Sequence, residues 1–319
     1  MRVLAAPDKF RGTLSAHEAA AAIAAGARRA GAEAVELPLA DGGEGTLDVL
    51  GGGNRTTLVT GPLGEPVEAA WQLDLDGGGA LIEAAQACGL TLAGGAERND
   101  PLRATSRGVG ELILAAIEVG AHRVIVTVGG VASTDGGVGA VDAVGGRLAF
   151  PVKVACDVEA RFLDAADVFA PQKGATPEQV RVLRERLVKL DVPDQPGAGA
   201  AGGLAGGLAA LGATLVPGFD LVAEHLELDH HLYETDLVIT GEGLFDATSL
   251  TGKVVGGVLA RAANAGVETL VVAGDVVMNS PVDAVSLVAL CGRERALAEP
   301  AACIAEVVEK ELRGRTRTA

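Results

Sequence analysis

Short apolar runs alternate with Ala-rich amphipathic stretches at both ends of the chain, and the middle follows another pattern. Residues 2–6 and 34–39 have the apolar character of strands that are buried on both faces. The stretch between them has helical periodicity up to about Ala30, and Ser15 is placed to cap its first turn. This β-α-β opening is typical of a parallel sheet.

The same alternation returns near the C-terminus. Its predicted strands are residues 237–240, 269–273 and 285–289, and its predicted helices are residues 255–265 and 300–312. Because the two ends of the chain share one pattern, we predict that they form one α/β domain together. We assign residues 1–56 and 228–319 to this domain.

The middle of the chain begins with short strand-like runs in residues 54–84, separated by turn clusters, which predict an antiparallel meander. Further predicted elements are a helix at 108–120, strands at 124–128 and 152–155, and an amphipathic helix that begins at Thr176. We therefore predict a second α/β domain, residues 57–227, inserted into the first. A chain of 319 residues is longer than a single hydrophobic core usually supports, so its length also agrees with two domains.

Composition narrows the class of protein. With 49% hydrophobic and 21% charged residues, the chain has the makeup of an ordinary globular protein. Its net charge of -16 argues against nucleic acid as a partner, because phosphate backbones select basic surfaces. The four cysteines are scattered without metal-binding spacing, which favours reduced thiols in a cytoplasmic protein. Residues 195–219 are uncharged but rich in Gly, so we expect a buried Gly/Ala helix there and no membrane partner.

Gly-rich stretches with carboxylates follow several of the predicted strands. Residues 124–128 run into a turn with a Ser/Thr pair and Asp135, residues 37–40 run into Asp41 and a Gly-rich turn, and residues 236–240 run into Gly241-Glu242-Gly243. Glycines allow the backbone to approach a ligand, and free amides there can cradle an anion. Because ligands bind at the carboxyl ends of strands in α/β sheets, we predict that these turns form one site.

Several kinds of chemistry are disfavoured by the residues present. The chain has no Gly-x-Ser-x-Gly elbow and no evident Cys/His pairing for nucleophilic catalysis. The neighbouring His225, His230 and His231 lie in a polar helical stretch rather than in a zinc-binding pattern. A Gly-x-Gly-x-x-Gly pattern occurs at residues 197–202 but follows no strand. The hypothesis of an NAD-linked oxidoreductase rests on this pattern alone, and we disfavour it. Phosphoryl transfer fits best, since it requires amides, cations and carboxylates that hold Mg²⁺.

Short motifs that occur in a fixed order support this hypothesis. They are residues 6–16 (APDKFRGTLSA), 40–46 (ADGGEGT), 99–102 (NDPL), 134–137 (TDGG), 155–158 (ACDV), 171–176 (PQKGAT), 199–204 (GAAGGL) and 238–243 (VITGEG). In these motifs the chain resembles the type I glycerate kinases nearly from end to end. The resemblance implies a flavodoxin-like, three-layer α/β domain built from both termini, with a second α/β domain containing a mixed sheet inserted in the middle.

The resemblance also implies an activity. This is ATP-dependent, Mg²⁺-assisted phosphorylation of D-glycerate, with 2-phosphoglycerate as the favoured product and the site in a cleft between the domains. The partners would be small molecules, D-glycerate and ATP, for a chain that acts as a monomer or homodimer.

The motifs and the Gly-rich turns together nominate the site residues. Candidate catalytic carboxylates are Asp41, Asp135, Asp157, Glu242 and Asp246, of which Asp135 and Asp157 are the predicted metal ligands. Candidate substrate-binding residues are Asp8, Lys9, Arg11, Glu44 and Lys173. Candidate ATP-binding residues are Gly129, Gly130, Ser133, Gly136, Gly137 and Lys253.

The chain departs from the family pattern at a few positions. Val131 stands where relatives have Ser, Thr248 where they have Gln, and Arg11 where Lys is common. An Arg in place of Lys still binds phosphate, but with a different geometry. Val131 and Thr248 motivate an alternative, a non-catalytic metabolite-binding or regulatory descendant of the same fold.

Overall fold

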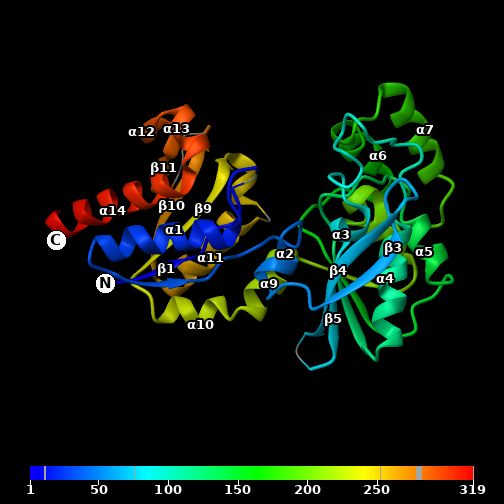
Figure 1. Ribbon diagram of the computed structural model, residues 1–319, viewed down its shortest axis with the longest axis horizontal. Coiled ribbons are helices and arrows are strands. Elements are labelled where there is room, and N and C mark those ends of the chain that lie inside the picture. Colours follow the sequence, from blue (N-terminus) through cyan, green and yellow to red (C-terminus); the bar gives the residue numbers. More distant parts are fainter. Residues whose placement is uncertain (11, 76, 252, 278–281, 319) are drawn as a thin grey trace. The chain divides into compact units, whose positions relative to one another are not determined.

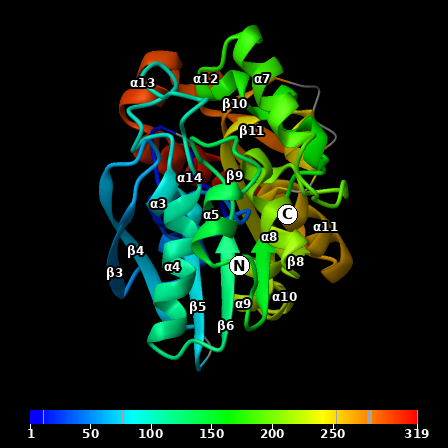
Figure 2. The ribbon, with the colours of Figure 1, turned by 90° about the vertical axis from the view of Figure 1, so that its right-hand side faces the viewer.

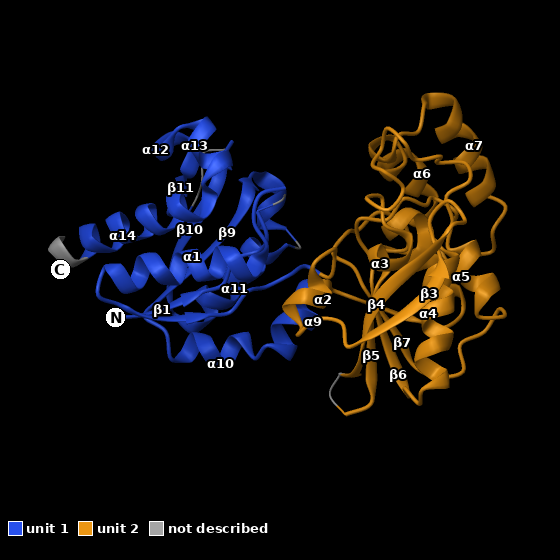
Figure 3. Cartoon of the chain, in the orientation of Figure 1, with its two compact units in different colours: residues 1–41, 219–319 blue, residues 42–218 orange. Residues whose placement is uncertain are grey.

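The chain folds into two compact units. The computed structural model describes residues 1–10, 12–75, 77–251, 253–277 and 282–318 (Figure 1). Unit 1 consists of residues 1–41 and 219–319, and unit 2 of residues 42–218 (Figure 3). Both divisions fall earlier in the chain than the boundaries expected from the sequence, and each unit is described by itself.

Local hydrogen bonds explain why residues 42–56 fold with unit 2. The buried carboxylate of Glu83 accepts hydrogen bonds from the amides of Gly45 and Leu47, at 3.0 and 2.9 Å, and so holds the start of α2 (Thr46–Val49). At the other division, the amide of Gly218 donates to Asp157 Oδ1 at 2.7 Å. These contacts join the ends of the inserted segment to its own sheet.

Unit 1 is built on a five-stranded sheet in the described part of the chain, with strand order β11-β10-β9-β1-β2. The strands are β1 (Arg2–Ala5), β2 (Glu33–Glu36), β9 (Leu237–Phe245), β10 (Glu268–Val276) and β11 (Ala284–Ser286). Each described neighbouring pair is parallel. The strand order reverses between β1 and β9, which is the flavodoxin-like arrangement with its switch point at that pair.

Helices cover both faces of this sheet because alternate strand residues point to opposite faces. Val3, Ile239 and Val272 pack with α1 (Ala16–Arg29) and α14 (Pro300–Thr318), which lie side by side (Figure 1). Val271 and Ala273 pack on the other face with α11 (Val254–Ala265). Unit 1 is therefore a three-layer α/β/α structure.

The predicted turn at Gly241-Glu242-Gly243 is wrong, because β9 continues through it to Phe245. Neither glycine has a positive φ. A Cβ on Gly241 would lie 2.0 Å from the Val272 carbonyl oxygen, so glycine serves here for close approach of two strands. The longer strand carries Glu242 beyond the end of β1, into the space at the carboxyl edge of the sheet.

The remaining elements of unit 1 are short. They are α9 (Gly218–His225), α10 (Leu228–Tyr233), the 3₁₀ helix η4 (Ala247–Leu250), α12 (Leu287–Cys291) and α13 (Arg293–Ala298). The strand predicted at 285–289 is only partly right, because Ser286 ends β11 and its side chain accepts the amide of Ala289 to begin α12. The predicted cap of α1 is observed, since Ser15 and Glu18 form a capping box.

Unit 2 contains a six-stranded sheet with order β3-β4-β5-β6-β7-β8 among the described residues. The strands are β3 (Arg55–Thr60), β4 (Pro66–Leu75), β5 (Gly79–Glu83), β6 (Arg123–Thr127), β7 (Val152–Ala155) and β8 (Thr214–Val216). The first three pair antiparallel, as the predicted meander requires, and β5 to β8 pair parallel. The sheet is therefore mixed.

The helices of unit 2 are α2, α3 (Ala84–Cys88), α4 (Arg107–Glu118), α5 (Val138–Ala143), α6 (Ala165–Phe169), α7 (Pro177–Leu187) and α8 (Leu204–Ala210). Turns of 3₁₀ helix are η1 (Phe162–Asp164), η2 (Pro171–Lys173) and η3 (Ala200–Gly203). The helices α4 and α5 lie side by side (Figure 2) and share one core cluster with α8. The uncharged segment 195–219 thus contains a short helix and a strand rather than one long helix.

The fold class predicted from the sequence is confirmed: the chain is α/β, with one parallel and one mixed sheet. Within the described ranges, no helix has the length and apolar character needed to cross a membrane.

The close approach at Gly241 is testable by Gly241→Ala. The added methyl would clash with the Val272 carbonyl oxygen, so we expect the free energy of unfolding to fall by roughly 3 kcal/mol. Gly314→Ala in α14 is the control, because a Cβ there meets nothing within 4 Å, and it should add about 0.5–1 kcal/mol through helix propensity. Urea unfolding measures both changes. Equal effects of the two substitutions would contradict the packing argument.

Candidate functional site

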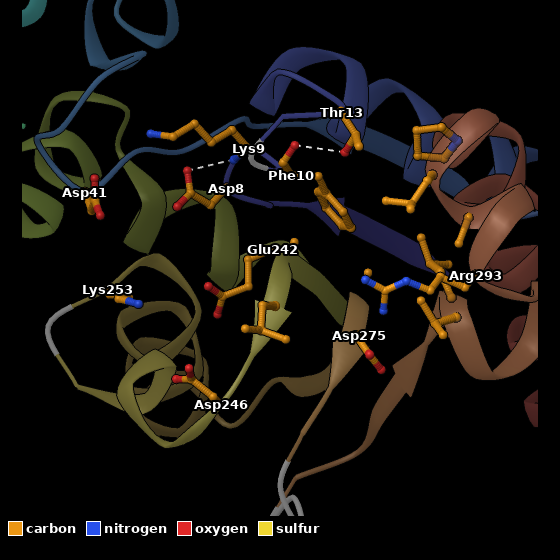
Figure 4. Close-up of a pocket in the computed structure, with 18 residues that line it drawn as sticks. Asp8, Lys9, Phe10, Thr13, Asp41, Glu242, Asp246, Lys253, Asp275 and Arg293 are labelled. Atoms are coloured by element: carbon orange, nitrogen blue, oxygen red, sulfur yellow. Dashed lines mark hydrogen bonds between the residues drawn. The ribbon is translucent and has the colours of Figure 1, made fainter. Parts of the chain in front are cut away.

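A cavity of about 530 Å³ opens in unit 1 at the carboxyl edge of the sheet, where β1 and β9 form the switch point (Figure 4). Ligands of doubly wound sheets bind at this position. Charged residues that line it are Asp8, Lys9, Asp41, Glu242, Asp246, Lys253, Asp275 and Arg293. Apolar residues that line it are Phe10, Leu244, Leu287, Val288, Ala296, Leu297 and Pro300.

Asp8 follows β1 and is held firmly by the backbone. Its amide donates to the Gly241 carbonyl oxygen at 2.9 Å, and its Oδ1 accepts the amide of Lys9 at 2.7 Å. Burial raises the pKa of Asp8 to about 7, and the nearby carboxylates of Asp41 and Glu242 add to this rise. Asp8 can therefore exchange a proton near neutral pH.

Glu242 enters the pocket from β9. Burial raises the pKa of its carboxyl, whereas the Ser249 hydroxyl and Lys253 oppose the rise. Its Oε1 is buried and accepts no hydrogen bond from the described residues. A buried acceptor without a donor is unfavourable unless a ligand, water or ion satisfies it, so this atom is a candidate contact for one of these.

Thr248 links two other charged groups of the pocket. Its hydroxyl donates to Asp246 Oδ1 at 2.6 Å and accepts from Lys253 Nζ at 3.1 Å. The Thr248 hydroxyl and amide hydrogen bonds lower the pKa of Asp246, which also caps η4. Residue 248, one of the departures from the family pattern, therefore orients Lys253.

Asp275 and Arg293 were missed by the sequence reasoning. Asp275 lies near the carboxyl end of β10. The rule that ligands bind at the carboxyl ends of strands, which selected the other acidic residues, could therefore have selected Asp275 as well. Its Oδ1 accepts the Ser286 hydroxyl at 3.1 Å. Arg293 begins α13, and its guanidinium points into the pocket (Figure 4). No signal in the sequence distinguishes Arg293 from a surface arginine.

The predicted site residues divide between the two units. Unit 1 brings together Asp8, Lys9, Asp41, Glu242, Asp246 and Lys253 in one pocket. Unit 2 contains Glu44, Gly129, Gly130, Ser133, Asp135, Gly136, Gly137, Asp157 and Lys173. Arg11 lies outside the described residues.

Asp135 is surrounded by donors of its own unit. Its Oδ2 accepts the amide and hydroxyl of Ser106, at 2.9 and 2.8 Å, and the amide of Gly139 at 3.2 Å. Its Oδ1 accepts the amide of Gly137 at 3.1 Å. Asp135 thus ties the turn after β6 to the start of α4.

The glycines of this turn approach other protein atoms closely. Gly136 and Gly137 have φ of +68° and +78°, and their amides donate to the Gly202 carbonyl oxygen and to Asp135. A Cβ on Gly129 would lie 2.7 Å from Gly43 Cα, and one on Gly130 would lie 3.0 Å from Glu44 Oε2. In this structure the turn packs against its own unit.

Lys173 is buried behind the same turn. Its Nζ donates to the Ser133 carbonyl oxygen at 2.5 Å and lies 3.4 Å from Thr134 Oγ1. Burial lowers the pKa of Lys173 to about 8. The neighbouring hydroxyl of Ser133 is buried without a partner among the described residues. Lys173 therefore holds the turn in place through its hydrogen bond to Ser133.

The carboxylates do not form a preassembled metal cage. Among the described residues, no group of three or more His, Cys, Asp or Glu side chains is arranged to hold a metal ion. Mg²⁺ commonly uses one or two carboxylates together with waters and phosphate oxygens, so a cage is not required.

Comparison with known proteins identifies the family. A family model described as the glycerate kinase family matches residues 3–151 and 147–311. The chain belongs to the glycerate kinase family. This confirms the resemblance inferred from the motifs, and with it the prediction of a kinase.

Individual members of the glycerate kinase family cover most of the chain. Glycerate 2-kinase of Escherichia coli K12 is 40% identical over 309 residues, with 81% of each chain covered. Glycerate kinase of Bacillus subtilis 168 is 39% identical over 331 residues, with 88% of this chain and 86% of the relative covered. The crystal structure of a Salmonella typhimurium LT2 protein assigned as glycerate kinase 2 has a TM-score of 0.82 and 34% identity, and covers 100% of this chain and 99% of its own.

The raised pKa of Asp8 predicts a stability effect of Asp8→Asn in metal-free buffer. A carboxyl whose folded pKa lies above its ordinary value stabilises the fold at low pH, and that stability is lost as the pH rises through about 7. Relative to the wild type, the free energy of unfolding of the variant should rise by about 1–3 kcal/mol as the pH increases from 5 to 8, since one pKa unit is worth about 1.4 kcal/mol.

Asp246→Asn is the control for this titration. The pKa of Asp246 is lowered in the folded state, so the contribution of its carboxylate to stability changes only at pH values below the ordinary pKa of aspartate. The difference in free energy of unfolding between this variant and the wild type should therefore be constant from pH 5 to pH 8. Urea unfolding at both pH values measures the two variants. A constant difference for Asp8→Asn as well would show that Asp8 does not titrate in this window.

Proposed function

We propose that this protein phosphorylates D-glycerate with ATP and Mg²⁺ and that the transfer takes place at the unit 1 pocket. The observation that carries the proposal is the group of desolvated carboxylates, with two lysines beside them, at the switch point of a flavodoxin-like sheet. Family membership supports the substrate, because curated members are named glycerate kinase. We further propose 2-phosphoglycerate as the product and the cytoplasm as the location.

Asp8 is our candidate for the general base. Its carboxylate is held by the Lys9 amide on Oδ1, which leaves Oδ2 to accept the proton of the reacting glycerate hydroxyl. A base works best when its pKa is close to the working pH, and Asp8 meets this condition. Lys9, next in the chain, provides a cation for the glycerate carboxylate.

The pocket residues fit a magnesium ion. Carboxylate oxygens are the ligands that Mg²⁺ prefers, and Glu242 Oε1 is a buried acceptor without a donor in the described structure. Glu242 and Asp41 are the residues that would hold the ion, which when bound neutralises charge on the transferred phosphate. Lys253, oriented by Thr248, supplies a further cation to the phosphate oxygens.

The residues that the sequence nominated in unit 2 stay predictions. Asp135, Asp157 and the turn glycines make hydrogen bonds or close contacts within this unit, whereas the Ser133 hydroxyl is buried without a partner among the described residues. A non-catalytic descendant remains the second candidate, motivated by Val131 and Thr248. Val131 is buried in the unit 2 core, and Thr248 connects pocket residues, so neither residue removes a group from the unit 1 pocket.

The proposed reaction is tested by incubating the protein with Mg·ATP and D-glycerate. We expect ADP release and a phosphorus NMR signal of 2-phosphoglycerate. Asp8→Asn should lower kcat by about 10²- to 10⁴-fold, the range for loss of a positioned base, although the same variant is expected to be more stable. Asp191→Asn, an exposed aspartate of unit 2, is the control and should leave kcat unchanged. Ligand binding without turnover in the wild type would favour the non-catalytic descendant.

The role of Thr248 is tested by Thr248→Val and Thr248→Ser. Valine removes the hydroxyl that links Asp246 to Lys253, so we expect kcat/KM for ATP to fall roughly tenfold because the lysine is misplaced. Serine keeps the hydroxyl and should restore activity. Thr251→Val is the control, since the Thr251 hydroxyl donates only to the Thr248 carbonyl oxygen in the described structure. If valine and serine behave alike, the hydroxyl does not orient Lys253.

A further inference from the structure

The unit 1 pocket has an apolar end that the proposed acceptor substrate does not explain. A cavity of about 530 Å³ falls in the range of sites that hold whole cofactors or drug-sized ligands, about 300–1,000 Å³. D-Glycerate has a polar group on every carbon atom and gains nothing from an apolar wall. The carboxylates and lysines around Asp8 suffice for glycerate and the transferred phosphate, so the remaining volume requires another ligand part.

The apolar wall comes from three consecutive helices. Val288 lies on α12, Ala296 and Leu297 lie on α13, and Pro300 begins α14. The Leu297 side chain is 56% exposed although it lines the cavity. An exposed apolar surface inside a pocket is typical of a site for a flat, apolar ligand group.

Two charged residues stand near this wall. Arg293 points into the cavity from α13 (Figure 4), is exposed, and has no hydrogen bond or ion pair to any residue in the described ranges. Asp275 is placed by β10, and its Oδ1 is oriented by the Ser286 hydroxyl that also begins α12. An arginine is suited to phosphate oxygens, and an oriented carboxylate to ribose hydroxyls.

We propose that the apolar end of the unit 1 pocket binds the purine base of the phosphate donor, against Val288, Leu297 and Pro300. Asp275 accepts the ribose hydroxyls, and Arg293 contacts the phosphates nearest the ribose. The terminal phosphate then extends toward Lys253 and Glu242. This inference rests on the proposed function, because it assigns the donor to the pocket in which transfer takes place.

The turn after β6 in unit 2 is the competing place for the nucleotide. Its amides at Gly136, Gly137 and Gly139 donate to protein acceptors, and the Cβ positions of its glycines are occupied by protein atoms. An anion cradle requires free amides, and these three are paired, although the Ser133 hydroxyl of the same turn is buried without a partner among the described residues. The apolar wall and Arg293 in unit 1 satisfy the requirements of a nucleotide better.

The test measures binding of ADP and of inorganic pyrophosphate, each with Mg²⁺, by calorimetry on the full chain. Leu297→Ser should weaken ADP binding by about tenfold or more and leave pyrophosphate binding unchanged, because serine removes contact with the base alone. Arg293→Ala should weaken both ligands. Leu290→Ser on α12 is the matched control, since Leu290 is 46% exposed and does not line the cavity. The KM for D-glycerate should be unaffected by Leu297→Ser.

The outcomes separate this inference from the proposed function. If Leu297→Ser binds ADP as tightly as Leu290→Ser while the wild type turns over, the base subsite is wrong and the kinase assignment stands. If ADP binding depends on Leu297 but the wild type does not phosphorylate glycerate, the subsite stands and the proposed function fails. A loss of ADP binding in Ser133→Ala, with none in Leu297→Ser or Arg293→Ala, would place the nucleotide in unit 2 and overturn the inference.

Discussion

The crowding of carboxylates at one sheet edge is the constraint on which the candidate site depends. The carboxylates of Asp8, Asp41 and Glu242 line one pocket because β2 and β9 flank β1 with their carboxyl ends at the same edge. Burial raises the pKa of Asp8 most, because desolvation disfavours its charged form, and the charges of Asp41 and Glu242 raise it further. Such a group of like charges is unfavourable in the absence of a cation or proton, which is the usual signature of a functional site.

Glycine makes this arrangement possible at one particular point. Without a side chain at Gly241, β9 can run against β10 closely enough to continue past the end of β1, and the next residue, Glu242, reaches the pocket. The same residue accepts the amide of Asp8 through its carbonyl oxygen. One glycine therefore sets the positions of two of the carboxylates.

Much of the fold was predictable from periodicity, and less of the site. The strands and the capped helix α1 followed from apolar alternation and from Ser15, and the meander followed from turn clusters.

Gly241-Glu242-Gly243 was misread as a turn because sequence alone does not distinguish a glycine needed for positive φ from one needed for close strand approach. The turn around Asp135 has the pattern of an anion site, and in the structure Asp135 and the Gly136 amide are paired with Ser106 and Gly202 through tertiary contacts that no local pattern reveals, whereas the Ser133 hydroxyl has no partner among the described residues. Arg293 was missed because only the direction in which α13 presents it brings its side chain to the pocket.

A crystal structure with Mg²⁺, a non-hydrolysable ATP analogue and D-glycerate tests the central claim most directly. The account predicts that the terminal phosphate and the metal ion lie beside Glu242 and Lys253, with a glycerate hydroxyl against Asp8. A nucleotide held instead by the turn around Asp135 in unit 2, with the unit 1 pocket free of both substrates, would contradict it.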